Sequence, residues 1–254
     1  MNNLRIINGY LLDGNPSRES EFEKLYISLR EREGRIFTEM EIAKLPVVSS
    51  SHPHFKEWKV RKNSCTQLLK YVKQEGHFSN ILEIGCGNGW LSAQLSLATG
   101  GEVTGIDINS TELRQAKRVF AAARNLTFLA GDIRSGILGD KKVDLIVFAA
   151  SIQYFKSFKE IINTSLQYLT LQGEIHILDS HFYLPENMIP ARKRTKKYFS
   201  DAGFPRMSHY YFHHSIRELQ GFNYRLLHNP HSWMNKVSFR KNPFYWVIIK
   251  DFSR

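Results

Sequence analysis

The chain has only two cysteines among its 254 residues, Cys65 and Cys86, which excludes a fold held together by a disulfide framework. Cys86 lies inside a glycine-rich turn, where a crosslink would obstruct a ligand, so we expect both thiols to be reduced. No run of about 18 apolar residues occurs, and no signal-like apolar segment follows Met1. The sequence therefore predicts no membrane span, and we expect a cytosolic protein.

Metal-binding motifs are also missing. The ten histidines have no accompanying cysteine pair and no His-Glu-x-x-His helix, so no metal site is predicted. Acidic residues are scarce only in the last third of the chain, because residues 181–254 hold 13 Lys/Arg against 4 Asp/Glu. The preceding parts, 1–77 and 78–180, are close to neutral, so the net charge of +11 belongs to the carboxyl-terminal third.

The sharpest cluster of positive charge is the stretch 192–197. Such a cluster can steer an acidic substrate or a phosphate backbone toward a site, and it can equally be a solvated helix face. No RNA-binding motif accompanies it. An acidic small molecule is therefore one candidate substrate, and nucleic acid is disfavoured as a partner.

The chain does contain a strand that ends in three alternating glycines. The apolar run 80–84 is typical of a buried parallel strand, and Gly85, Gly87 and Gly89 follow it before an amphipathic helix begins. Glycine lacks a Cβ, so the chain can reverse sharply there and a ligand can lie directly against the backbone. The pattern predicts a ligand-binding turn at a helix amino terminus.

The spacing of these glycines narrows the choice of ligand. A dinucleotide motif, Gly-x-Gly-x-x-Gly, needs its last glycine where this chain has Trp90, so a nicotinamide enzyme is disfavoured. The next predicted strand ends in Asp107, 20 residues after Gly87. A carboxylate in that place can accept hydrogen bonds from both hydroxyls of a ribose. We therefore expect a ligand that contains ribose.

Strands and helices alternate through the centre of the sequence. This alternation predicts a parallel, doubly wound sheet with right-handed crossovers. The expected strands are 80–85, 102–107, 126–130, 143–149 and 173–179, and the expected helices are 90–98, 110–124 and 156–169.

The flanking segments have patterns of their own. Residues 1–77 are expected to form a helical cap over the ligand end of the sheet, and residues 78–254 form the α/β domain, with a substrate-side insertion at about 180–214. The cap helices are expected at 18–33, 38–45 and 55–75, the second with a capping box of Thr38 and Glu41. After 180 we expect a basic helix at about 190–201, a helix near 215–219, and strands at 223–228 and 244–250.

Four segments in order resemble the motifs of the class I S-adenosylmethionine-dependent methyltransferases. They are 82–92, 105–108, 130–133 and 143–148. The resemblance covers residues 78–180 and a later closing hairpin, and four motifs at β-α-β spacing are far more specific than one glycine turn. It implies an α/β fold with a doubly wound, mostly parallel, seven-stranded Rossmann-like sheet and an antiparallel C-terminal hairpin. It also implies S-adenosylmethionine as cofactor.

The same resemblance implies roles for individual residues. The glycines approach the methionine part of the cofactor, Glu83 orients the turn or the amino group, Asp107 binds the ribose, and Asp132 accepts the adenine amine. Ile108 and Ile133 cover the two faces of the adenine ring. Without a ligand, the acids would serve as capping or turn residues. The expected cofactor-binding residues are Glu83, Gly85, Cys86, Gly87, Asn88, Gly89, Asp107, Ile108, Asp132, Ile133 and Ala149.

The segment 148–155 says most about the methyl acceptor. Family members that methylate exocyclic base nitrogens carry Asn/Asp-Pro-Pro-aromatic here, and this chain does not, so it resembles the small-molecule branch. Tyr154 is a candidate to border the reacting methyl group, with a packing role as the alternative. His181 and the stretch 209–214 are candidates to contact the acceptor, where a histidine can take a proton from a hydroxyl or thiol. Tyr154 and His181 are thus the candidate catalytic residues.

The expected reaction needs little catalytic machinery. Methyl transfer from a sulfonium is an in-line displacement, so the protein mainly has to align the reacting atoms, and a base is needed only if the acceptor is protonated. A small-molecule methyltransferase is the leading hypothesis. A methyltransferase acting on RNA or another polyanion and a non-catalytic S-adenosylmethionine-binding protein are the alternatives. The acceptor and the oligomeric state stay open.

Overall fold

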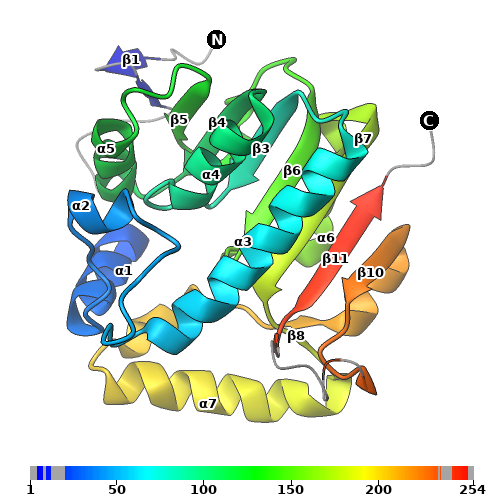
Figure 1. Cartoon of the computed structure of the whole chain (residues 1–254). Coiled ribbons are helices and arrows are strands. Elements are labelled where there is room, and N and C mark those ends of the chain that lie inside the picture. Colours follow the sequence, from blue (N-terminus) through cyan, green and yellow to red (C-terminus); the bar gives the residue numbers. More distant parts are fainter. Residues whose placement is uncertain (1–4, 8–9, 13–20, 234, 236–241, 251–254) are drawn as a thin grey trace.

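Five strands from the centre of the chain form the parallel core of the main sheet (Figure 1). The computed structural model describes residues 5–7, 10–12, 21–233, 235 and 242–250. The sheet order of these strands is β5-β4-β3-β6-β7, and all neighbours are parallel, as the alternating pattern predicts. Their bounds are β3 Asn80–Ile84, β4 Glu102–Asp107, β5 Leu126–Ala130, β6 Val143–Ala149 and β7 Leu169–Ser180.

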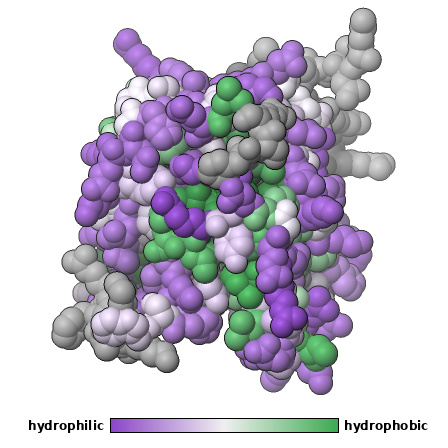
Figure 2. Space-filling model, turned by 90° about the vertical axis from the view of Figure 1, so that its right-hand side faces the viewer, coloured by the Kyte–Doolittle hydropathy of each residue, from purple (hydrophilic) through white to green (hydrophobic). Residues whose placement is uncertain are grey.

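An antiparallel pair completes the sheet beyond β7. β11 (Tyr245–Lys250) pairs with β7, and β10 (Tyr224–His228) pairs with β11, both antiparallel. The predicted seven-stranded, mostly parallel sheet with an antiparallel C-terminal hairpin is therefore confirmed. β10 is the edge strand, and Figure 2 views the molecule from this side, where apolar side chains gather in the middle of a largely hydrophilic face.

The opposite edge carries two strands that the sequence did not predict. β1 (Arg5–Ile7) and β2 (Tyr10–Leu12) form an antiparallel hairpin, and β2 pairs in parallel with β5. The sheet therefore has nine strands, and the expected helical cap does not include these residues. Strands of three residues are too short to show a hydrophobic period, which is why the pattern missed them. Residues 18–20 of the first expected helix lie outside the described residues.

Helices cover both faces of the sheet. α3 (Phe55–Glu75), α4 (Trp90–Thr99) and α5 (Ser110–Val119) lie on one face, and α6 (Phe158–Gln167) lies behind the sheet on the other (Figure 1). Each face has its own apolar core, and each fully buried side chain contributes roughly 1.5–3 kcal/mol. The first core includes Trp58, Leu68, Leu91, Leu95 and Leu145, and the second includes Ile146, Phe148, Phe158, Ile161 and Ile162.

Helix ends follow local sequence signals in most places. α3 has the bounds that the sequence predicts, and it ends at Gly76, which adopts the left-handed conformation with φ 70°. α2 (Glu39–Ile42) starts with the expected capping box of Thr38 and Glu41. α5 ends at Val119 rather than at 124, and the helix expected near 215–219 is the 3-10 helix η5 (Ile216–Gly221).

Two further helices lie beyond the carboxyl ends of the parallel strands. Figure 1 shows α1 (Glu21–Arg32) and α7 (Met188–Asp201) there, and the 3-10 helix η4 (Pro205–His209) follows α7. Leu29 of α1 packs against Phe199 of α7 and Met207 of η4. Segments from before and after the parallel strands therefore meet over the same end of the sheet.

Cys65 and Cys86 are both buried and both free, as predicted. Within the described part of the chain, no helix combines the length and the apolar character that crossing a bilayer requires. The cytosolic location stays a prediction.

Candidate active site

Three cavities adjoin one another at the carboxyl ends of the parallel strands. The inner cavity lies against the glycine turn, β4 and α1. The arginine cavity lies between the same turn and three arginines of the amino-terminal segment. The outer cavity opens between α1, α3 and α7. Ala150, the residue after β6, lines all three, so one ligand can extend from one cavity into the next.

The glycine turn forms the floor shared by the inner and arginine cavities. Gly85 and Gly87 line both cavities and have φ values of 76° and 53°, in the left-handed region that favours glycine. A Cβ on Gly85 would lie 2.4 Å from the Ser151 Cβ. Ser151 in turn donates a hydrogen bond to the Ile84 carbonyl at 2.6 Å. The turn therefore needs glycine both for its backbone conformation and for its close approach to the segment after β6.

Asp107 ties the end of β4 to this turn. Its carboxylate accepts hydrogen bonds from the backbone N–H groups of Gly87 at 2.7 Å and Asn109 at 2.8 Å. Burial raises the pKa of Asp107, and these backbone hydrogen bonds oppose that rise. Because each carboxylate oxygen has two lone pairs, Asp107 can still accept hydrogen bonds from a ligand in the inner cavity.

The remaining walls of the inner cavity fit a flat apolar group with a polar edge. Ile108 and Ile133 both line it, the first 45% exposed and the second 1% exposed. Asp132 lines it too, and Arg134 Nε donates to both carboxylate oxygens, at 3.0 and 3.1 Å. Although burial acts to raise the pKa of Asp132, the hydrogen bonds from Arg134 lower it, so this carboxyl stays ionised. On the side of α1, the rings of Phe22 and Tyr26 close the cavity.

Two carboxyls, the buried Glu83 and the half-buried Glu112, stand on one side of the arginine cavity. Glu83 is 2% exposed and accepts a hydrogen bond from Ser92 Oγ at 2.5 Å. Burial raises the pKa of Glu83 to about 8. Burial and then the nearby Asp107 charge raise the pKa of Glu112 to about 7. No Lys, Arg or His of the described residues forms an ion pair with either group, so a ligand cation would be the natural partner for both.

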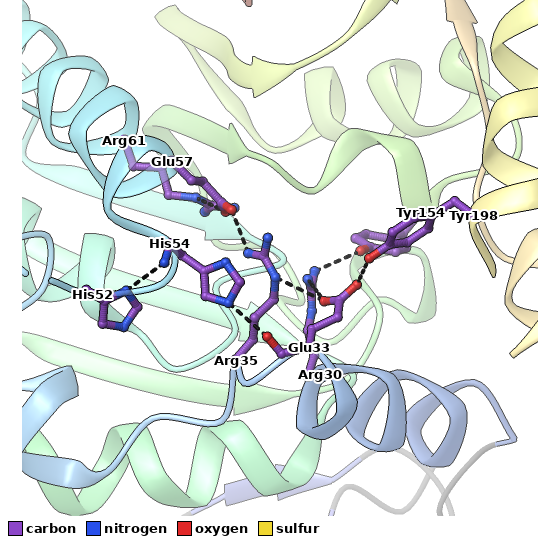
Figure 3. Close-up of polar contacts among 9 residues, drawn as sticks. All are labelled: Arg30, Glu33, Arg35, His52, His54, Glu57, Arg61, Tyr154 and Tyr198. Carbon is purple, nitrogen blue, oxygen red and sulfur yellow. Dashed lines mark hydrogen bonds and ion pairs between the residues drawn. The ribbon is translucent and has the colours of Figure 1, made fainter. Parts of the chain in front are cut away.

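The other side of the arginine cavity is a chain of ion pairs (Figure 3). Glu33 Oε2 lies 3.0 Å from both Arg30 Nη1 and Arg35 Nε, and Glu57 lies 2.6 Å from Arg35 Nη1 and 3.0 Å from Arg61 Nε. Three guanidinium groups thus share two carboxylates, which leaves one surplus positive charge. This positive charge faces Glu83 and Glu112 across the cavity. The arginine cavity is therefore complementary to a zwitterionic amino-acid group.

Most of the predicted cofactor-binding residues come together in these two cavities. Gly85, Gly87, Asp107, Ile108, Asp132 and Ile133 line the inner cavity, and Glu83, Gly85, Cys86, Gly87, Asn88 and Ala149 line the arginine cavity. Gly89 lines neither. It has φ 74° at the start of α4, and a Cβ there would lie 2.5 Å from the Phe128 ring, so its observed contact is with the core.

The two candidate catalytic residues lie in different places. Tyr154 lines both the inner and the outer cavity, and its hydroxyl accepts a hydrogen bond from Arg30 Nη2 at 3.3 Å. The centroid of its ring lies 5.6 Å from the centroid of the Phe22 ring and 5.8 Å from that of the Tyr26 ring. His181 lines only the outer cavity, where burial and then the Arg194 charge lower the pKa of its imidazole. A neutral imidazole of this kind can contact an acceptor but is a weak base.

Several residues of the site escaped the sequence analysis. They are Phe22, Tyr26, Arg30, Arg35, Arg61, Glu112 and Asp179. The arginines belong to no motif, and only the folded chain brings residues 30 and 61 together. Glu112 had a usable signal, because Asn109 caps α5 by accepting from the Glu112 N–H, which places this acid in the first turn beside Asp107.

Metal-binding residues do not gather anywhere in the described segments. No group of three or more His, Cys, Asp or Glu side chains there is placed to hold an ion. The site therefore has three parts. The backbone of the glycine turn forms its floor, the inner cavity has apolar walls with carboxylates at its edge, and the arginine cavity carries side chains of both charges.

Comparisons with known sequences agree with this geometry. The sequence profile of a family described as "Methyltransferase domain" matches residues 81–173. Malonyl-[acyl-carrier protein] O-methyltransferase of Bacillus cereus is 28% identical over 118 residues, covering 45% of this chain and 43% of the relative. The putative methyltransferase YqeM of Bacillus subtilis is 33% identical over 85 residues, 33% of this chain and 34% of that protein. The chain thus spans less than half the length of these relatives.

Solved structures extend the likeness in fold beyond residues 81–173. The plantazolicin methyltransferase BpumL, solved with a desmethyl-plantazolicin analogue and SAH, aligns with TM-score 0.56 and 16% identity over 91% of this chain and 97% of its own. A geranyl diphosphate C-methyltransferase of Streptomyces coelicolor A3(2) aligns with TM-score 0.55 and 11% identity over 91% and 98%. At such identities the likeness concerns the fold. Residues 81–173 are thus a methyltransferase domain, and the strand order and glycine turn around them are those of the class I S-adenosylmethionine-dependent methyltransferases.

Proposed function

We propose that this protein transfers the methyl group of S-adenosylmethionine to a small-molecule acceptor. The observation that carries the proposal is the match between the adjoining inner and arginine cavities and the parts of this cofactor. The inner cavity offers a carboxylate for the ribose and apolar walls for the adenine. The arginine cavity offers two acids for the ammonium group and arginines for the carboxylate of the methionine part. When bound, the cofactor supplies an electrophilic methyl group on its sulfonium.

Individual residues have defined parts in this proposal. Asp107 accepts hydrogen bonds from the ribose hydroxyls, Asp132 from the adenine amine, and Ile108 and Ile133 lie against the ring. Glu83 and Glu112 hold the ammonium group, while Arg35 and Arg61 hold the carboxylate. Gly85, Cys86, Gly87, Asn88 and Ala149 form the floor under the methionine part, and Gly89 supports that floor through its contact with Phe128.

The outer cavity is the proposed acceptor site. Tyr154 stands where it adjoins the inner cavity, so its ring borders the place where the methyl group leaves, and His181 contacts the acceptor further out. These side chains contribute to catalysis by aligning the acceptor with the methyl group. Such alignment lowers the entropic cost of reaching the in-line geometry. The outer cavity has a volume of about 390 Å³, which lies within the range of small-molecule sites and supports a small acceptor.

Binding of the demethylated cofactor, S-adenosylhomocysteine, tests the proposal directly. Calorimetry should give a dissociation constant in the micromolar range, and the melting temperature should rise with ligand concentration. Asp107→Ala should weaken this affinity by about ten- to a hundredfold, since a half-buried carboxylate that accepts from ligand hydroxyls is lost. No thermal shift at millimolar ligand would contradict the proposal. Unchanged affinity in Asp107→Ala would contradict the placement of the ribose.

Methylation of RNA is the alternative that the positive charge of α7 favours. Arg192, Lys193 and Lys196 are exposed on this helix, near the outer cavity. RNA affinity that depends steeply on salt, together with methylated RNA as product, would support this alternative. A non-catalytic cofactor-binding protein would show the same thermal shift but yield no methylated product in any acceptor screen.

A further inference from the structure

Asp179 stands at the inner end of the proposed acceptor site, at the carboxyl end of β7. The residue is 7% exposed, and it lines the outer cavity. It adopts φ 54°, as does Ala150 at the end of the neighbouring strand β6, and the Ala150 N–H donates to the Leu178 carbonyl at 3.0 Å. Non-glycine residues seldom adopt this conformation, and those that do cluster at functional sites. Since Ala150 lines all three cavities, Asp179 lies next to the junction of donor and acceptor sites.

The carboxylate of Asp179 has one oxygen fixed and one free. Ser64 Oγ donates to Asp179 Oδ1 at 2.6 Å and accepts from Asn242 Nδ2 at 3.2 Å, so the carboxylate is held in one orientation. Asp179 Oδ2 has no hydrogen-bond partner within the described residues. Among the described residues, Arg35 Nε is the one fully buried side-chain nitrogen or oxygen that lacks a hydrogen bond. Because Asp179 Oδ2 also lacks a hydrogen bond and is not in that class, it is not fully buried. Oδ2 is therefore available to a molecule in the outer cavity.

No cation of the described residues forms an ion pair with Asp179. Arg61 is the nearest strong positive influence, but its guanidinium pairs with Glu57. Burial raises the pKa of Asp179, and the Arg61 charge only partly opposes this rise. A buried carboxyl without a counter-ion is costly unless a ligand donates a hydrogen bond or a positive charge to it.

His181, the other protonatable group of this cavity, is placed less well for a proton transfer. It occupies an exposed position, where partial desolvation by the cavity walls and then the Arg194 charge lower the pKa of its imidazole. It lies at the mouth of the cavity, whereas Asp179 lies beside Ala150. Proton transfer in the reaction requires a base within hydrogen-bond reach of the nucleophile, which is held at the junction.

We propose that Asp179 is a catalytic residue that binds the nucleophile of the acceptor through Oδ2 and takes its proton, and that this nucleophile is a hydroxyl or amine. This inference rests on the proposed function. In the step, the nucleophile forms a bond to the methyl carbon, the carbon–sulfur bond breaks with its electron pair going to sulfur, and the proton of the nucleophile passes to Asp179 Oδ2. An acceptor carboxylate carries no proton to give, and Asp179 would repel it.

A matched pair of probes tests the proposal without knowledge of the natural acceptor. The outer cavity has the aromatic walls Tyr198, Tyr211 and Phe244, so 2-phenylethylamine and phenylacetate are suitable probes of equal size and opposite charge. With S-adenosylhomocysteine bound, the ¹³C resonance of the Asp179 carboxyl is followed by NMR during each titration and assigned by its loss in Asp179→Asn. The amine should displace this resonance, and phenylacetate should leave it in place.

The variants separate binding from folding. Asn tolerates left-handed backbone, so Asp179→Asn should fold and bind S-adenosylhomocysteine as the wild type does, while its affinity for the amine falls about tenfold. Asp201→Asn makes the same chemical change on the exposed end of α7 and should leave the amine affinity unchanged. Ser64→Ala keeps the carboxyl but removes its fixed donor, so the titration midpoint of Asp179 should rise.

Failure of this inference differs from failure of the proposed function. If the wild type does not bind S-adenosylhomocysteine, the proposed function itself is wrong. If it binds but both probes move the Asp179 resonance equally, or neither moves it, Asp179 does not contact the nucleophile and the inference is overturned.

Discussion

Glu83 and Glu112 are carboxyl groups that the folded protein holds in the protonated form near neutral pH. Burial raises the pKa of Glu83 to about 8 and that of Glu112 to about 7. An unfolded chain would ionise both groups near pH 4.5. The site therefore stores unfavourable free energy that a cationic ligand group would relieve, since such a group stabilises the ionised acids.

We expect the contribution of Glu83 to the stability of the unliganded protein to fall as the pH rises from about 5 to 8. In this range the folded state retains the Glu83 proton and the unfolded state does not, so raising the pH favours unfolding. Glu83→Gln cannot ionise and should flatten the curve, with its melting temperature at pH 8 falling a few degrees less, relative to pH 6, than that of the wild type. Thermal melts monitored by circular dichroism across this range provide the measurement.

Glu112 acts in the same direction, so the Glu83→Gln curve should keep a smaller slope that Glu83→Gln/Glu112→Gln removes. Parallel curves for wild type and the single variant would show that Glu83 does not titrate in this range. Saturating S-adenosylhomocysteine should also flatten the wild-type curve, because its ammonium group lowers the pKa of both acids.

Gly85 is the position where substitution should be most costly to the turn. An alanine there would have to adopt φ 76° and place its Cβ 2.4 Å from the Ser151 Cβ, so Gly85→Ala should lower the free energy of unfolding by about 2–4 kcal/mol. Gly100→Ala is the control, because Gly100 has φ 67° but no atom within 4 Å of its Cβ position. Its loss should be about 1 kcal/mol. Urea unfolding measures both, and equal losses would mean that contact with Ser151 is unimportant.

The sequence predicted residues that belong to a continuous motif and missed those that only the fold brings together. Gly85, Gly87 and Asp107 were predictable because a strand, a turn and a second strand keep them at fixed distances along the chain. Arg30 and Arg61 meet through Glu33, Arg35 and Glu57. Glu33 and Arg35 lie in the loop after α1, and Glu57 lies on α3. No local period or spacing encodes such a meeting, so it could not be predicted.

At the scale of elements, α1 has the largest influence on access to the site. Phe22 and Tyr26 line the inner cavity, and Arg30 lines the other two. The helix is held from outside as well, because Tyr198 of α7 donates a hydrogen bond to Glu33, just after α1. We expect a bound cofactor to leave past these contacts.

Weakening the link between α7 and α1 should therefore speed cofactor release. Tyr198→Phe removes one hydrogen bond and keeps the ring, so the dissociation rate of S-adenosylhomocysteine should rise about two- to tenfold. Stopped-flow measurement of intrinsic tryptophan fluorescence can follow the release, since Trp58 and Trp90 line the arginine cavity. Tyr224→Phe, on the edge strand β10, should release the ligand at the wild-type rate. An unchanged rate in Tyr198→Phe would mean that α1 does not have to move.

Element boundaries were predictable wherever a residue dictates the end. Gly76 ends α3, and Thr38 with Glu41 begins α2, because a left-handed glycine and a capping box satisfy the free backbone groups. β7 was expected to start at 173 but begins at Leu169, since pairing with β6 extends it across a residue pattern that is not strictly apolar. The short strands β1 and β2 depend on the edge of β5, which no local pattern reveals.

At the scale of the whole molecule, most of the net charge of +11 comes from residues 181–254, outside the segment 78–180 that carries the glycine turn. We expect RNA binding no tighter than about 1 μM at physiological salt, the range of non-specific contacts to phosphate. Fluorescence anisotropy with a labelled 20-nucleotide RNA, read between 50 and 200 mM salt, measures this. Charge-reversed Lys193→Glu should bind even more weakly. Nanomolar affinity in the wild type would instead favour the RNA alternative.

The parallel core of the fold was predictable in full because its strands are apolar runs separated by amphipathic helices. The closing pair β10 and β11 was also predicted, from the resemblance to the family. What the sequence could not predict is how segments distant in the chain enclose the outer cavity, because α1, α3 and α7 contribute walls without sharing any motif.

The distribution of these walls along the chain has an evolutionary consequence. Much of the outer cavity comes from 29–61 and 181–211, outside the segment 81–173 that the family shares, whereas the turn beneath the donor lies within it. The first of these stretches also carries Arg35 and Arg61 of the arginine cavity, whereas 181–211 lines neither the inner nor the arginine cavity. We therefore expect a chimera that grafts only 181–211 from another family member to accept a new substrate while keeping the same methyl donor.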